Sequence, residues 1–227
     1  MGEKKKSGYS DQLPLSNKKV VEACKKFPQE QNPLYNQKTA ARRRLHFDRH
    51  IYQPLLVDMP EKAQIVPPGL KESEARFVRD LREYWNTEKD QSLAGKEIFL
   101  LRNLSRGYGI GFFQERGFYP DFILWLVDQT TEAQRIVFIE PHGMLHAKTY
   151  LHDEKARLHE RLPALAEEIG KRSGRNNITL DAFIISATPY NDLYQRYDDG
   201  TWDRARFASK HILFPERETG YDYMRIL

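Results

Sequence analysis

The sequence Tyr119-Pro-Asp-Phe-Ile-Leu-Trp-Leu-Val127 and, shortly after it, Arg135-Ile-Val-Phe-Ile-Glu140 decide the fold of this chain. Both runs are apolar and rich in β-branched and aromatic residues, which is typical of buried strands. The stretch that joins them, Asp128-Gln-Thr-Thr-Glu-Ala133, is polar and short enough for a direct connection between neighbouring strands. The two runs are therefore predicted to form an antiparallel hairpin centred near Thr131.

Further helices and strands are predicted on both sides of this hairpin. Before it, residues 72–86 carry an apolar stripe at helical spacing with Ser73 as the cap, and residues 96–102 form a strand. After it, residues 153–172 are predicted to be helical and residues 178–187 to form another buried strand. The order helix, strand, strand, strand, helix, strand predicts an α/β fold in which helices pack around a mixed sheet.

Length and charge distribution divide the chain into an arm and a domain. A chain of 227 residues is long enough for one domain with a full core. Residues 1–50 hold twelve Lys and Arg but only five Asp and Glu, and Pro67-Pro68-Gly69 ends the segment because proline restricts the backbone. We therefore predict an extended basic arm or linker over 1–67, which either follows a phosphate backbone or only aids solubility, and a domain over 68–227.

The sequence also favours a cytoplasmic protein with no membrane partner. The single cysteine, Cys24, cannot form an internal disulfide, and no apolar segment typical of a signal peptide follows the Lys-rich start. The longest apolar run, Phe122-Ile-Leu-Trp-Leu-Val127, is far shorter than the roughly 20 residues that a membrane helix needs.

Polar side chains interrupt the hairpin near its open end. If Thr131 is the centre, Asp121 lies opposite His142 and diagonal to Glu140, and all three side chains share one face because alternate residues of a strand do so. Two neighbouring carboxylates raise each other's pKa unless a cation lies between them. Magnesium prefers such oxygen ligands, so the pattern predicts a divalent-metal site of the kind that hydrolyses phosphodiesters.

Two of these motifs resemble a known family signature. Gly117-Phe-Tyr-Pro-Asp-Phe122 and Phe138-Ile-Glu-Pro-His142 resemble the PD-(D/E)XK nuclease signature, with histidine where the family has lysine. Roughly residues 40–190 are similar to the C-terminal nuclease region of DEAD/DEAH-box helicases related to the Res subunits of type III restriction enzymes. The resemblance implies a restriction-endonuclease-like core and a deoxyribonuclease that uses Mg²⁺ or Mn²⁺. It also implies DNA and a helicase or ATPase motor as partners, in restriction or phage defence.

Carried over to this chain, the resemblance assigns four residues to the site along the hairpin. Asp121 and Glu140 are the implied metal ligands, the carbonyl of Pro141 is a further oxygen, and His142 occupies the lysine position. Because an imidazole with a pKa of about 6.5 is mostly neutral at pH 7, three outcomes stay open. His142 acts as a base or orients the water, Lys148 or Lys155 supplies the charge, or the site is inactive.

An acid on the first helix often joins these residues in the family. Glu74 lies on the same inward stripe as Val78 and Leu81, whereas Glu83 falls off that stripe. Glu74 is therefore the fourth predicted catalytic residue. The alternative is that Glu74 is a first-turn acid favoured by the helix dipole.

Basic side chains near the turn Gly107-Tyr-Gly-Ile-Gly111 are predicted to bind DNA phosphates. They are Arg102, Arg106 and Arg116, together with Lys148 further along the chain. The alternative for the three arginines is an ordinary solvated loop. Two other functions also remain open: an inactive nucleic-acid-binding module of the same fold, and a protein-interaction domain in which the carboxylates form a structural polar cluster.

Overall fold

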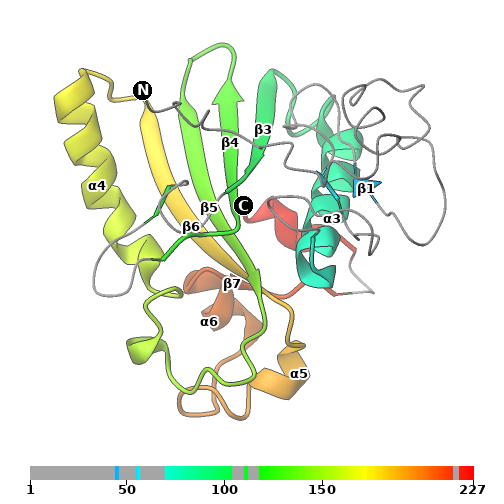
Figure 1. Cartoon of the computed structure of the whole chain (residues 1–227). Coiled ribbons are helices and arrows are strands. Elements are labelled where there is room, and N and C mark those ends of the chain that lie inside the picture. Colours follow the sequence, from blue (N-terminus) through cyan, green and yellow to red (C-terminus); the bar gives the residue numbers. More distant parts are fainter. Residues whose placement is uncertain (1–43, 46–54, 57–69, 104–109, 112–117, 217–219) are drawn as a thin grey trace, which may run out of the picture.

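A mixed five-stranded sheet forms the centre of the molecule (Figure 1). The structure is a computed structural model that describes residues 44–45, 55–56, 70–103, 110–111, 118–216 and 220–227. Across the sheet the strands are β3 (Lys96–Arg102), β4 (Phe122–Asp128), β5 (Gln134–His142), β6 (Ile178–Ser186) and β7 (Ile212–Leu213). Strands β3, β4 and β5 are antiparallel, and β6 and β7 continue parallel to β5.

Two long helices, α3 (Glu72–Glu88) and α4 (Leu158–Ser173), cover opposite faces of this sheet (Figure 1). Phe77 and Val78 of α3 pack in one core with Phe122, and α4 buries Leu158 in a second core with Phe138. Each such apolar side chain stabilises the fold by roughly 1.5–3 kcal/mol when fully buried. The other helices among the described residues are η1 (Tyr150–His152), α5 (Tyr190–Leu193), α6 (Arg204–Ser209) and η2 (Asp222–Arg225).

The predicted α/β class, the order of the six predicted helices and strands and the start of the first helix at residue 72 are confirmed. The predicted cap of that helix and the start of the second long helix are wrong. Ser73 does not cap α3: Lys71 is the cap residue, and its backbone N–H donates to the Glu74 carboxylate at 3.3 Å. The second long helix begins at Leu158 rather than near 153. Before it, the Asp153 carboxylate accepts a hydrogen bond from the backbone N–H of Ala156 at 3.0 Å, which holds a separate turn.

The hairpin of β4 and β5 forms as predicted, but its register is shifted by two residues. Phe122 pairs with Ile139, and the backbone N–H of Asp128 donates to Ala133 at 2.9 Å. The Asp128 carboxylate also accepts hydrogen bonds from the backbone N–H groups of Thr130 and Thr131, which fixes the turn one step earlier than predicted. A shift of two residues leaves every side chain on its predicted face.

Within the predicted arm, the described residues form a short antiparallel pair of β1 (Arg44–Leu45) and β2 (Leu55–Leu56). The predicted boundary at Pro67-Pro68-Gly69 lies outside the described residues. Among the helices that the structure describes, none has both the length and the apolar character needed to cross a membrane.

Candidate active site

The two hairpin acids lie side by side at the open end of β4 and β5. Since Phe122 pairs with Ile139, the next position places Asp121 beside Glu140, not opposite His142 as predicted. The backbone N–H of Asp121 donates to Oε2 of Glu140 at 3.2 Å. The following pair, Ile123 and Phe138, packs under α4, so alternation directs both acids to that same face.

The Asp121 carboxyl group is the least compensated charge at this end of the sheet. Its side chain has no hydrogen bond or ion pair with any residue that the structure describes. Burial, with the negative charges of Glu140 and Glu74, raises the pKa of Asp121 to about 7, although Lys71 and Lys155 act in the opposite direction. An acid held in this way would be relieved by a bound cation.

The charge of Glu140 is compensated by a lysine from the turn that precedes α4. Its side chain is only 10% exposed, and Oε1 accepts a hydrogen bond from Nζ of Lys155 at 2.6 Å. Lys155 lies in the turn that precedes α4, and its ammonium group also lies 5.0 Å from the centre of the Phe118 ring. The sequence offered Lys148 and Lys155 as possible sources of the positive charge, and of these two Lys155 contacts an acid of the site, Glu140. Lys148 is exposed, and its side chain has no polar partner among the described residues.

His142 ends β5 and is partly exposed beside this pair. Burial and the charge of Lys155 lower the pKa of His142 below its ordinary value, so the imidazole is neutral at pH 7 and able to accept a proton. The preceding carbonyl, that of Pro141, accepts a hydrogen bond from the Ser73 hydroxyl at 3.3 Å. This bond ties the start of α3 to the end of β5.

Glu74 points inward from the first turn of α3, as its spacing predicts, and is 3% exposed. Its Oε2 accepts a hydrogen bond from the guanidinium of Arg102 at 3.1 Å, and only 11% of the Arg102 side chain is exposed. Arg102 is thus held by Glu74 instead of extending from a solvated loop. Arg106 and Arg116 lie outside the described residues, and Glu83 is exposed.

Two residues at the site were missed by sequence reasoning. Lys71 is exposed at the start of α3, close enough for its charge to act on both Asp121 and His142. Asn103 is buried after β3 and fixes the backbone before Asp121: its Nδ2 donates to the carbonyls of Ile110 (2.7 Å) and Pro120 (2.9 Å). Neither residue belongs to a periodic pattern. A single lysine or asparagine in a connecting segment is also too common to indicate a function.

Replacement of Asn103 by Asp tests this anchoring of the motif. The change keeps the shape but removes both donated hydrogen bonds and turns the carboxylate against two carbonyl oxygens. We expect a loss of roughly 2–3 kcal/mol in the free energy of unfolding, because buried acceptors are left unsatisfied. Urea unfolding monitored by tryptophan fluorescence measures the loss. Asn191→Asp, at an exposed position in α5, is the matched control, and equal stability of the two variants would contradict the anchoring role.

In the part of the chain that the structure describes, no group of three His, Cys, Asp or Glu side chains lies close enough together to hold a metal ion unaided. The donor set is instead two adjacent carboxylates with a nearby carbonyl, which suits an ion that keeps several waters. Comparison of the chain with protein-family models, with curated proteins and with solved structures found no match. The nuclease resemblance therefore stays a prediction.

Proposed function

We propose that the chain is a metal-dependent nuclease module that hydrolyses DNA phosphodiester bonds, with Mg²⁺ or Mn²⁺ as its cofactor. The observation that carries this proposal is the half-buried Asp121 carboxyl group, which lies beside Glu140 and has no partner among the described residues. A structural polar cluster would pair each of its acids, as Lys155 pairs Glu140. An uncompensated acid is costly to a fold and is typical of a functional site.

The residues present fit a magnesium ion. Asp121 and Glu140 would hold it with their carboxylates, and Pro141 would add its carbonyl oxygen, which has a second lone pair beside the one used by Ser73. The positive charge would return the pKa of Asp121 toward its ordinary value. When bound, magnesium polarises a phosphoryl oxygen and lowers the pKa of a bound water.

The protein groups around the acids supply the other functions that the reaction needs. Lys155 carries the positive charge that the family lysine would bring, and its ammonium group is already at the site through Glu140. His142, neutral at pH 7, is placed to take a proton from the attacking water. Lys71 is exposed beside both groups and is suited to hold a phosphate of the DNA backbone.

A plasmid-nicking assay tests this function. With Mg²⁺ or Mn²⁺ in excess, the full chain is expected to convert supercoiled plasmid to open-circular or linear DNA. With EDTA it is expected to be inactive, because the carboxylates need the ion. Glu140→Gln is expected to remove the activity. The matched control is Glu167→Gln, at an exposed position of α4, which should cut like wild type. Equal cutting by Glu140→Gln would assign the activity to a contaminant and contradict the proposal.

One observation favours a second candidate, an inactive nucleic-acid-binding module. Lys155 occupies Oε1 of Glu140, and position 142 lacks a lysine, so the same groups could form a closed ion pair that no metal enters. In that case wild type and Glu140→Gln would both be inert in the nicking assay while binding a labelled duplex equally in a gel shift. Absence of both cutting and binding would instead favour a protein-interaction domain.

The partners and the biological role are proposed from the sequence resemblance alone. It implies a helicase or ATPase motor, on another region or another chain, that delivers DNA to the nuclease in restriction or phage defence. A cytoplasmic location is consistent with that role.

A further inference from the structure

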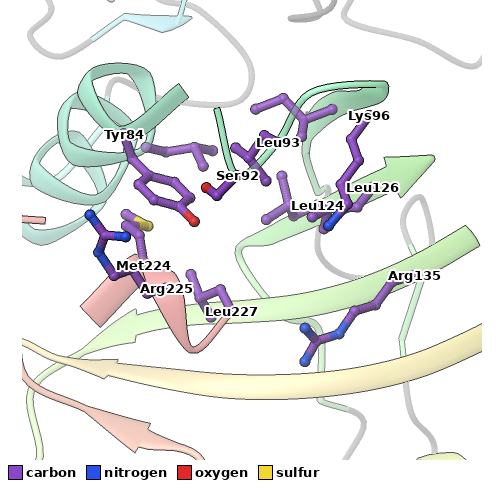
Figure 2. Close-up of a pocket in the computed structure, with 12 residues that line it drawn as sticks. Tyr84, Ser92, Leu93, Lys96, Leu124, Leu126, Arg135, Met224, Arg225 and Leu227 are labelled. Atoms are coloured by element: carbon purple, nitrogen blue, oxygen red, sulfur yellow. The ribbon is translucent and has the colours of Figure 1, made fainter. Parts of the chain in front are cut away.

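A pocket separate from the acids lies where the C-terminal segment meets the sheet on the α3 side (Figure 2). Its volume is about 260 Å³, and neither Asp121 nor Glu140 lines it. The walls come from α3, the turn before β3, the strands β3 to β5 and the segment around η2, with an apolar lining that includes Leu81, Ile98, Leu124 and Met224. These are core side chains of the domain, so the pocket has a fixed, preformed apolar wall.

Two basic side chains form one rim of this pocket. Leu126 of β4 pairs with Ile98 on one side and with Arg135 on the other, and Lys96 lies two residues before Ile98 on the same face. Lys96 and Arg135 therefore flank Leu126 from the two neighbouring strands. Figure 2 shows both on the side of the pocket away from Tyr84 and Arg225.

The polar groups around the pocket are mostly donors or cations. Arg135 is paired with Asp181 at 2.7 Å, and Arg225 is paired with Glu88 at 2.9 Å. The ammonium group of Lys96 is exposed and forms no ion pair or hydrogen bond within the part of the chain that the structure describes. Its cross-strand neighbour is Asp128, a partly exposed acid whose pKa is lowered by hydrogen bonds in its turn and, to a lesser extent, by the charge of Lys96. A cation that lacks a close ion pair beside an apolar wall is complementary to an anion with an apolar body.

We propose that this pocket binds a small amphipathic carboxylate, with its apolar body against Leu124 and Leu126 and its carboxylate between Lys96 and Arg135. A volume of about 260 Å³ lies just below the roughly 300–1,000 Å³ of typical ligand pockets, so the pocket suits a small ligand such as a carboxylate with about eight carbons. Burial of the ligand's hydrocarbon tail supplies the binding free energy, and the two cations select its carboxylate group. The site does not depend on the nuclease function.

Calorimetric titration of the full chain with octanoate tests the proposal. We expect a dissociation constant on the order of 0.1–1 mM for a ligand of this size. Lys96→Gln should weaken octanoate binding about fivefold, because one exposed charge–charge contact is lost. Lys89→Gln, an exposed lysine that does not line the pocket, is the matched control and should bind like wild type.

Neutral 1-octanol separates recognition of the anion from simple filling of an apolar space. It should bind several-fold more weakly than octanoate and be insensitive to Lys96→Gln. The proposal is overturned if octanoate does not bind, if octanol binds as well as octanoate, or if Lys96→Gln has no effect on octanoate. Because Asp121 does not line the pocket, Asp121→Asn should keep the octanoate affinity, so failure of the nuclease proposal would not affect this result.

Discussion

Asp121→Asn is expected to abolish metal-dependent cleavage and, at the same time, to make the protein more stable. The variant loses a ligand of the proposed ion, so the cleavage rate should fall by a factor on the order of 10³ or more. It also replaces a half-buried acid, whose pKa is raised to about 7, with a neutral amide of the same shape. The two effects have opposite signs because the acid serves the ion and not the fold.

The pH dependence of this stability gain follows from the raised pKa of Asp121. Between about pH 4 and pH 7 the folded protein holds a proton on Asp121 that the unfolded chain releases, so the free energy of unfolding falls as pH rises through this window. The asparagine variant lacks this loss. Its advantage over wild type should be smallest near pH 4 and should reach roughly 1–3 kcal/mol above pH 7, after allowance for partial exposure.

Urea unfolding at pH 5 and pH 8, without divalent ions, measures this difference. Asp90→Asn, at an exposed position just after α3, is the control and should show no such change between the two pH values. If Asp121→Asn were less stable than wild type at pH 8, the carboxylate would have a structural partner, and the main support for the metal site would be lost.

Lys155→Gln is expected to reduce cleavage by a factor of roughly 10² to 10³ while DNA binding changes little. The ammonium group lies 2.6 Å from Glu140 and is the only ion-pair partner of that carboxylate in the part of the chain that the structure describes. Removal of a charge placed to stabilise a reacting phosphate typically has an effect of this size. The change in stability should be much smaller, about 1 kcal/mol, because 41% of the Lys155 side chain is exposed.

A double variant tests whether Lys155 takes the role of the lysine that the nuclease signature, which this chain resembles, has at the position of His142. In Lys155→Gln/His142→Lys the charge returns to the end of β5, and cleavage should recover at least tenfold over the single variant. Single-turnover nicking rates at saturating DNA measure the recovery, with Lys171→Gln, an exposed lysine of α4, as the control. An unchanged rate in Lys155→Gln would exclude Lys155 from the reaction. If Lys155→Gln lost cleavage and the double variant did not recover it, the imidazole of His142 would have a specific role in addition to that of Lys155.

Much of the fold could be predicted because local patterns are strong in this chain. The apolar runs of β4, β5 and β6 are long enough to specify buried strands, and the stripe of α3 placed Glu74 inward. The short β7, α5 and α6 lie in a tail without a sustained period, and the predictions did not include them. The start of α4 was placed too early because a helical spacing of leucines does not reveal the separate turn closed by Asp153.

The sequence by itself determined the α/β class, the order of the main elements and the face on which Asp121 and Glu140 lie, because strand alternation depends only on neighbours along the chain. Only the tertiary structure decided that Asp121 lies beside Glu140, that Lys155 reaches this pair and that Arg102 is held by Glu74. These contacts join segments from separate elements. They depend on the register set by the Asp128 turn and on how α3 and the turn before α4 pack against the sheet, which no local pattern encodes.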